Sequence, residues 1–177
     1  MITKTTMKPR KATILRILIG AAIGAPACVT VAQAQGPVQP VQWSAATKPA
    51  GTVARGGKLS IELSASVQTG WHVYGFTESP GGPIPLKIAI DDNPVLLGAG
   101  AISGTAPVKK HDAAFDLDIE SYTGVFTLRV PVQVKEHSAS GKQDVSVAVR
   151  FQACSDRTCL PPKTVHVPVP VEVVAGN

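Results

Sequence analysis

Residues 145–173 read VSVAVRFQACSDRTCLPPKTVHVPVPVEV, two valine-rich stretches on either side of a short segment that holds two cysteines. Apolar and polar residues alternate over 145–151 and again over 165–173. A period of two over this length is typical of half-buried β-strands. Pro168 and Pro170 interrupt the second stretch, and proline favours an edge strand because it has no N–H to donate to a neighbour. The segment therefore predicts a strand, a cysteine-bearing connection and an edge strand.

The same alternation occurs earlier in the chain, over residues 59–67 and 126–134. No segment has a convincing helical repeat. Clusters of Gly, Pro, Asn and Asp punctuate the middle of the sequence at 79–84, 91–94 and 104–107. Short strands separated by turn signals predict an all-β fold, and we expect a single immunoglobulin-like β-sandwich over residues 43–175.

The first 34 residues have a composition of their own. They hold no acidic residue, and an apolar stretch over 17–25 follows the basic residues Lys4, Lys8, Arg10, Lys11 and Arg16. This order, closed by the small-x-small site Ala32-Gln33-Ala34, is typical of a secretory signal peptide. We expect a cleaved signal at 1–34, a flexible leader at 35–42 and a periplasmic protein. Lipid attachment at Cys28 is not expected, because the preceding residues lack the usual Leu.

The net charge of the precursor comes from this segment. The 177 residues include 17 Lys+Arg and 12 Asp+Glu, for a net charge of +5. Without the five basic residues of the expected signal peptide, 17 − 5 = 12 basic residues balance 12 acidic ones. The basic character therefore gives no support to nucleic-acid binding. An apolar fraction of 44% permits a buried core, and no long apolar run indicates a multi-pass membrane protein.

Export would leave Cys154 and Cys159 as the two cysteines of the mature chain, in a compartment where disulfides persist. If the strand that ends at Phe151 continues regularly, Cys154 faces away from the core, so we expect it to be accessible. The next strand begins near Thr164, which puts the two cysteines across the mouth of a hairpin connection. At that separation they are close enough to bond.

Three interpretations of the pair are open. A structural staple across so short a loop would contribute only about 2 kcal/mol, and a structural bridge in an immunoglobulin fold would cross the core instead. A metal pair lacks histidine partners. An exposed short-loop disulfide is expected to be readily reduced, and Arg157 between the cysteines would favour a thiolate. The residues favour redox activity.

Two separated motifs resemble a known family. FQACSDRTCLPP at 151–162 resembles the active-site loop of the N-terminal periplasmic domain of the thiol:disulfide interchange protein DsbD, and GWHVY at 70–74 with GGP at 81–83 resembles its earlier signature. The resemblance extends over most of residues 41–175, and the family's domain is an immunoglobulin-like sandwich. It implies a redox pair that receives electrons from a membrane-embedded reductase domain. It also implies acceptors such as oxidised periplasmic disulfide isomerases or cytochrome c maturation factors.

The resemblance also implies roles for single residues. Cys159 would form the mixed disulfide with a partner protein, and Cys154 would resolve it. Phe115 would be the aromatic residue of a cap loop that shields the cysteines, and His72 or Tyr74 would hydrogen-bond a thiolate or tune its pKa. Alanines precede Phe115 where a relative has acidic residues, so any acidic modulation is expected from Asp112, Asp116 or Asp156.

We therefore predict an exported thiol–disulfide oxidoreductase of the protein-disulfide reductase type, with no cofactor and no metal. Its donor would be a separate membrane-embedded thiol reductase, because the sequence ends at Asn177 without such a domain. Its acceptors would be thioredoxin-like or disulfide isomerase proteins. The alternative is an exported immunoglobulin-like binding module with a purely structural disulfide, which contacts partners through the strand at 165–173. Hydrolysis is disfavoured because no nucleophile-elbow or phosphate-loop motif occurs.

Overall fold

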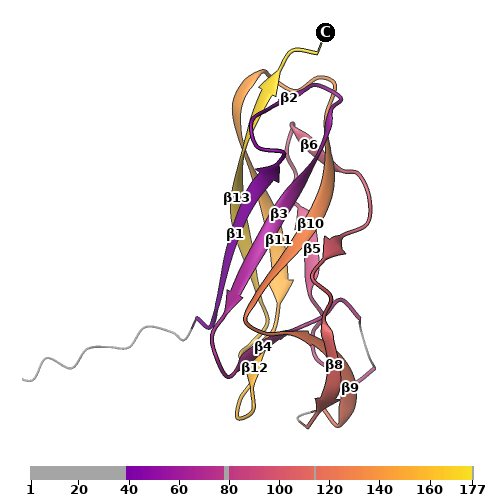
Figure 1. Ribbon diagram of the computed structural model, residues 1–177, viewed down its shortest axis with the longest axis vertical. Coiled ribbons are helices and arrows are strands. Elements are labelled where there is room, and N and C mark those ends of the chain that lie inside the picture. The colour runs from indigo at the N-terminus through magenta and orange to yellow at the C-terminus, as the bar shows by residue number, and fades with distance from the viewer. Residues whose placement is uncertain (1–38, 78–79, 114, 177) are drawn as a thin grey trace, which may run out of the picture. The chain divides into compact units, whose positions relative to one another are not determined.

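The computed structural model describes residues 39–77, 80–113 and 115–176, and every regular element in these ranges is a β-strand. The strands form three sheets (Figure 1). The first has the order β1-β3-β10-β6, with β7 also pairing with β10. Its strands are β1 (Val41–Lys48), β3 (Lys58–Val67), β6 (Leu96–Gly98), β7 (Ser103–Gly104) and β10 (Val125–Val134).

The other two sheets have four strands each. The second has the order β2-β13-β11-β5, formed by β2 (Thr52–Ala54), β5 (Lys87–Ile90), β11 (Gly141–Phe151) and β13 (Lys163–Val174). The third has the order β12-β4-β9-β8, formed by β4 (Trp71–Tyr74), β8 (Val108–Asp112), β9 (Leu117–Tyr122) and β12 (Ala153–Ser155).

The main core lies between the first two sheets, which form an immunoglobulin-like β-sandwich as predicted. Burial alternates along β3 and β11, where every second side chain is apolar and buried. Ile61 and Leu63 on β3, and Val147 and Val149 on β11, are 0% exposed. The alternation predicted for residues 59–67, 126–134, 145–151 and 165–173 is confirmed by β3, β10, β11 and β13.

The proline-containing strand lies at an edge of its sheet over most of its length. β13 pairs with β11 from Lys163 to Val173, whereas β2 covers only its last residues, Glu172–Val174. Pro168 and Pro170 lie before that covered part, where no described strand pairs with the outer side of β13. The predicted edge position is therefore confirmed for this part of the strand.

The third sheet is built by continuations of the sandwich strands and lies at the lower end of the view in Figure 1. The chain passes from β3 to β4, from β9 to β10 and from β11 to β12 within a few residues each. Gly70 and Gly124 make the first two turns with positive φ values of 82° and 62°, which glycine adopts without steric cost. The sandwich thus positions the cysteine-bearing β12.

The predicted signal peptide, Cys28 and residues 35–38 of the predicted leader lie outside the described residues. β1 begins at Val41, which is 5% exposed, two residues before the start predicted for the domain. No helix in the described residues is long and apolar enough to cross a membrane.

Candidate functional site

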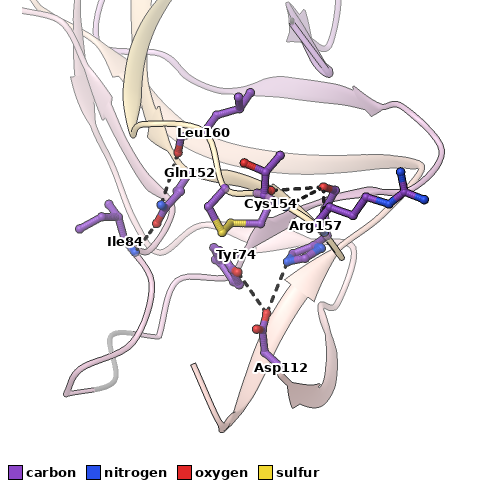
Figure 2. The surroundings of a disulfide bond; sticks show 11 residues. Tyr74, Ile84, Asp112, Gln152, Cys154, Arg157 and Leu160 are labelled. Carbon is purple, nitrogen blue, oxygen red and sulfur yellow. Dashed lines mark hydrogen bonds and ion pairs between the residues drawn. A yellow bond between two sulfur atoms is a disulfide. The ribbon is translucent and has the colours of Figure 1, made fainter. Parts of the chain in front are cut away.

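Cys154 and Cys159 form a disulfide, with an S–S distance of 2.06 Å and a Cα–Cα distance of 4.0 Å. The two residues face each other as an antiparallel bridge, as predicted for the mouth of a hairpin. Inside it, the Ser155 amide donates to the Thr158 carbonyl at 2.8 Å, and the Ser155 hydroxyl accepts from the amides of Arg157 and Thr158 at 3.3 and 3.2 Å. The pair is therefore held in a tight, hydrogen-bonded turn (Figure 2).

Gln152 fixes the point where the chain leaves the sandwich. It lies between β11 and β12, and its side-chain oxygen accepts a hydrogen bond from the Ile84 amide at 3.0 Å. Its side-chain nitrogen lies 3.4 Å from the Leu160 carbonyl, to which it donates. One side chain therefore ties the cysteine hairpin to the loop before β5, as Figure 2 shows.

The prediction that Cys154 is accessible is wrong, because its side chain is buried and the residue is 1% exposed. The face of the strand was predicted correctly, since Ala153 belongs to the main core while Cys154 belongs to a second apolar cluster. That second face is covered by Tyr74 and Ile119, with Phe115 packed against them. Cys159 is only partly buried, so it is the more accessible residue of the two.

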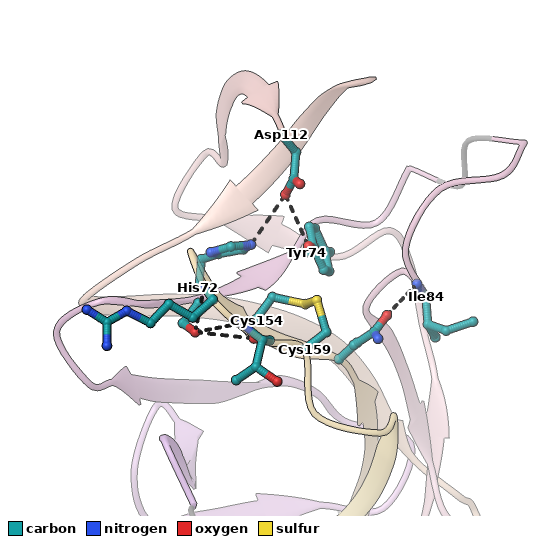
Figure 3. A network of polar contacts seen from close by, with 10 residues as sticks. His72, Tyr74, Ile84, Asp112, Cys154 and Cys159 are labelled. Carbon is teal, nitrogen blue, oxygen red and sulfur yellow. Dashed lines mark hydrogen bonds and ion pairs between the residues drawn. A yellow bond between two sulfur atoms is a disulfide. The ribbon is translucent and has the colours of Figure 1, made fainter. Parts of the chain in front are cut away.

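An aromatic row covers the buried cysteine. Phe115 lies in the turn between β8 and β9, and its ring meets Tyr74 edge-on with centroids 5.9 Å apart. Tyr74 in turn meets the His72 ring edge-on at 5.0 Å. The structure thus brings together the five residues singled out from the sequence. Four of them, His72, Tyr74, Cys154 and Cys159, are labelled in Figure 3.

Strand register places His72 beside the buried cysteine. β12 pairs antiparallel with β4, and Cys154 is directly opposite His72. Side chains of opposed residues lie on the same face of a sheet, with Cβ atoms about 4.5–5.5 Å apart. Tyr74, two residues after His72, shares that face. The Gly-Trp-His-Val-Tyr segment therefore supplies two polar groups next to Cys154.

Asp112 is the acidic residue of the site. It ends β8, is 9% exposed and accepts a hydrogen bond from the Tyr74 hydroxyl at 3.1 Å. Its Oδ2 also lies 3.5 Å from Nε2 of His72, and both contacts are drawn in Figure 3. Asp116 and Asp156, the other two acidic candidates, are exposed. The sequence did not distinguish Asp112 from the other two. In β8 only the last residue, Asp112, is buried, so the strand has no alternating pattern that would mark it.

Burial sets the protonation of the two polar side chains. The pKa of His72 lies below its usual value because the ring is desolvated, and Lys110 adds to this while Asp112 opposes it. The pKa of Tyr74 is raised above its usual range by burial and by the neighbouring Asp112 carboxylate. Near neutral pH His72 is therefore an uncharged imidazole and Tyr74 a phenol that keeps its proton.

Among the described side chains, no group of three or more His, Cys, Asp or Glu is arranged to hold a metal ion. What the site does hold is a bonded cysteine pair in a short hairpin, with one sulfur buried under aromatic rings and the other partly exposed. A short-loop cysteine pair with unequal exposure is chemically suited to thiol–disulfide exchange.

The chain belongs to the family of DsbD N-terminal domains. The sequence model of that family, described as "Thiol:disulfide interchange protein DsbD, N-terminal", matches residues 38–170. Membership gives the chain the family's broad activity, thiol–disulfide exchange, and its general kind of partner, other thiol–disulfide proteins. No curated protein matches the chain by sequence.

Solved structures of low sequence identity are also similar. The reduced N-terminal domain of DsbD from Neisseria meningitidis is 16% identical with a TM-score of 0.44, over 64% of this chain and 78% of that one. The N-terminal periplasmic domain of ScsB from Proteus mirabilis is 15% identical with a TM-score of 0.46, over 72% of this chain. This chain spans 44% of that ScsB domain.

Proposed function

We propose that this protein is an exported thiol–disulfide interchange domain that passes reducing equivalents to oxidised periplasmic proteins through Cys154 and Cys159. The observation that carries the proposal is the unequal exposure of the bonded pair, with Cys154 1% exposed and Cys159 partly exposed. A separate membrane-embedded thiol reductase supplies the electrons. Thioredoxin-like proteins, disulfide isomerases or cytochrome c maturation factors accept them.

The unequal exposure supports an order of attack for the two cysteines. In the reduced protein, the Cys159 thiolate attacks a client disulfide, bonds to one client sulfur and releases the other as a thiolate. Cys154 then attacks Sγ of Cys159, which re-forms the Cys154–Cys159 bond and releases the second client sulfur. Two electrons pass to the client, and a dithiol donor restores the reduced pair by the reverse exchange.

The equilibrium reduction potential of the pair tests this function. We expect a value in the band of about −120 to −270 mV that exchange proteins span. Titration of the mature protein against thiol buffers, with alkylation and mass readout, measures it. A value well below about −300 mV is typical of an inert structural bridge. That result would favour the alternative, an immunoglobulin-like binding module that uses the open edge of β13.

The proposed lid, Phe115, is tested by its truncation. In Phe115→Ala the edge contact with Tyr74 is lost, and such aromatic pairs contribute about 0.5–1.5 kcal/mol. We expect a small thiol to reduce the disulfide roughly 2- to 10-fold faster, because the cap opens more often. Stopped-flow reduction by dithiothreitol measures the rate. Leu97→Ala, a partly exposed residue of β6, is the control, and equal rates for wild type and Phe115→Ala would mean that Phe115 is no lid.

A further inference from the structure

The resolving step poses a chemical problem at Cys154. In the mixed disulfide between Cys159 and the client, Cys154 is a free thiol and must lose its proton before it can attack Sγ of Cys159. It lies in an apolar cluster with Tyr74 and Ile119, 1% exposed. Burial raises the pKa of a thiol because it penalises the thiolate. Under the closed cap the thiol has little contact with solvent, so a neighbouring base would speed its deprotonation.

One side chain is placed to be that base. His72 lies opposite Cys154 in the strand register, on the same face. It is 7% exposed, and its Nε2 lies 3.5 Å from Oδ2 of Asp112, a long contact with an acidic partner. A buried imidazole beside a carboxylate can take up a proton, because the carboxylate stabilises the imidazolium that forms.

A cleft connects this ring to solvent. It has a volume of about 220 Å³ and is lined by polar and charged side chains from β4, β8 and the cysteine hairpin. The other charged and titratable groups that line this cleft are Tyr74, Lys110, His111, Asp112 and Asp156. Of these, Asp112, Lys110 and Asp156 act on the charge of His72. A proton on the imidazole therefore has a polar path outward, away from the apolar cluster.

We propose that His72 is the general base that deprotonates Cys154 in the resolving step, and that Asp112 is its positioning residue. The inference rests on the exchange function proposed above. The Cys154 proton passes to the His72 ring, and the sulfur electron pair forms the bond to Sγ of Cys159. The bond between Cys159 and the client sulfur breaks, and its electron pair leaves with the client. His72 then gives the proton to the client thiolate or, through the cleft, to water.

The groups around His72 support it as the base, and none of them is better suited to that role. Burial keeps the pKa of His72 low, so the ring is free to accept a proton at neutral pH. The Asp112 carboxylate, 3.5 Å from Nε2, stabilises the imidazolium once it forms. The Tyr74 hydroxyl donates a hydrogen bond to Asp112 and keeps its proton, so Tyr74 cannot serve as the base. His111 is 59% exposed and faces Asp116 and Asp118 instead.

The resolving step can be timed alone with the aromatic disulfide dithiobis(nitrobenzoate). Reduced protein releases one coloured thiolate when Cys159 attacks the reagent and a second when Cys154 resolves the mixed disulfide. In His72→Gln we expect the first release to keep its rate and the second to slow by about 10²-fold at pH 7, the usual contribution of a general base. In Asp112→Asn we expect the second release to slow by roughly tenfold, because the imidazolium loses a charged partner.

The pH profile separates a base from a packing residue. In wild type, the rate of the second release should fall as the pH drops through the pKa of His72, which lies below its usual value of about 6.5. At higher pH the rate should be constant. In His72→Gln this fall in rate at low pH disappears, and the rate instead rises with the deprotonation of the Cys154 thiol at alkaline pH. Asp118→Asn, an exposed change on β9 outside the cleft, should keep the wild-type rate and profile.

The possible failures are distinguishable. A wild-type protein that releases no second thiolate has no resolving cysteine, which overturns the proposed function. A second release with equal rates in wild type and His72→Gln overturns the role of His72 alone. Should His72→Gln fail to fold, as judged by far-ultraviolet circular dichroism, a wild-type profile without a step below about pH 6.5 overturns the role of His72 in the same way.

Discussion

Cys154→Ser should stop turnover and leave the protein covalently attached to its client. Cys159, partly exposed in the hairpin, can still open a client disulfide, but no second sulfur remains to resolve the product. Loss of a catalytic nucleophile costs on the order of 10³-fold or more in turnover. Reduction of an oxidised thioredoxin-like protein measures the rate, and non-reducing electrophoresis detects the trapped complex.

The two cysteines should fail in different ways. Cys159→Ser is expected to lose turnover to the same extent without forming the complex, because the remaining sulfur of Cys154 is buried. Ser155→Ala, which removes hydroxyl hydrogen bonds of the hairpin but no sulfur, is the matched control and should retain most of the activity. A complex trapped by Cys159→Ser and not by Cys154→Ser would reverse the assigned order. Client binding that both serine variants leave intact, without turnover in wild type, would support the binding module.

The sandwich was predictable because its strands bury one face only. β3, β10, β11 and β13 are 10 to 12 residues long, so the two-residue period repeats often enough to be recognised. The prolines of β13 likewise indicated an edge by a local rule, the missing N–H. These features depend on residues close together in the sequence.

The third sheet left no comparable pattern. Its strands have three to six residues, and β4 buries consecutive residues because it is covered on both faces. The exposure of Cys154 was mispredicted for the same reason: the sequence of β11 and β12 identifies its face, but the cover comes from Phe115 and Ile119, more than thirty residues away. Such packing depends on how β8 and β9 fold back, which no short-range pattern records.

The contacts of Asp112 were equally hard to predict from the sequence, because they also depend on long-range strand pairing. Asp112 and Asp116 beside the expected cap, and Asp156 between the cysteines, were the three candidates. Only the pairing of β8 with β9, and of β9 with β4, brings Asp112 within 3.1 Å of the Tyr74 hydroxyl. A buried carboxylate needs such a partner, but the partner is 38 residues away in the sequence. The sequence therefore named Asp112 among three candidates but could not select it.

Phe151 joins the sandwich to the redox site, and its truncation should be the most destabilising change considered. It is the last residue of β11 and is 1% exposed, with its ring centroid 5.5 Å from that of Trp43. Lys163, its partner across the strand pair, places Nζ 5.5 Å from the same ring centroid. Replacing a buried Phe by Ala removes apolar burial and leaves a cavity, at a cost of about 3–5 kcal/mol. Urea unfolding of the oxidised protein measures the loss.

The site should respond to this change as well. Phe151 also lines an apolar cleft of about 370 Å³ with Ala153 and Leu160, which flank the two cysteines. The ring therefore supports the hairpin on the side away from the Tyr74 and Phe115 cap. We expect Phe151→Ala to increase the rate at which dithiothreitol reduces the disulfide, even below the onset of unfolding. Phe76→Ala, at 39% exposure, should change stability by only about 0.5 kcal/mol. A Phe151→Ala protein as stable as Phe76→Ala would mean that the junction is held by Gln152 and the strand pairing alone.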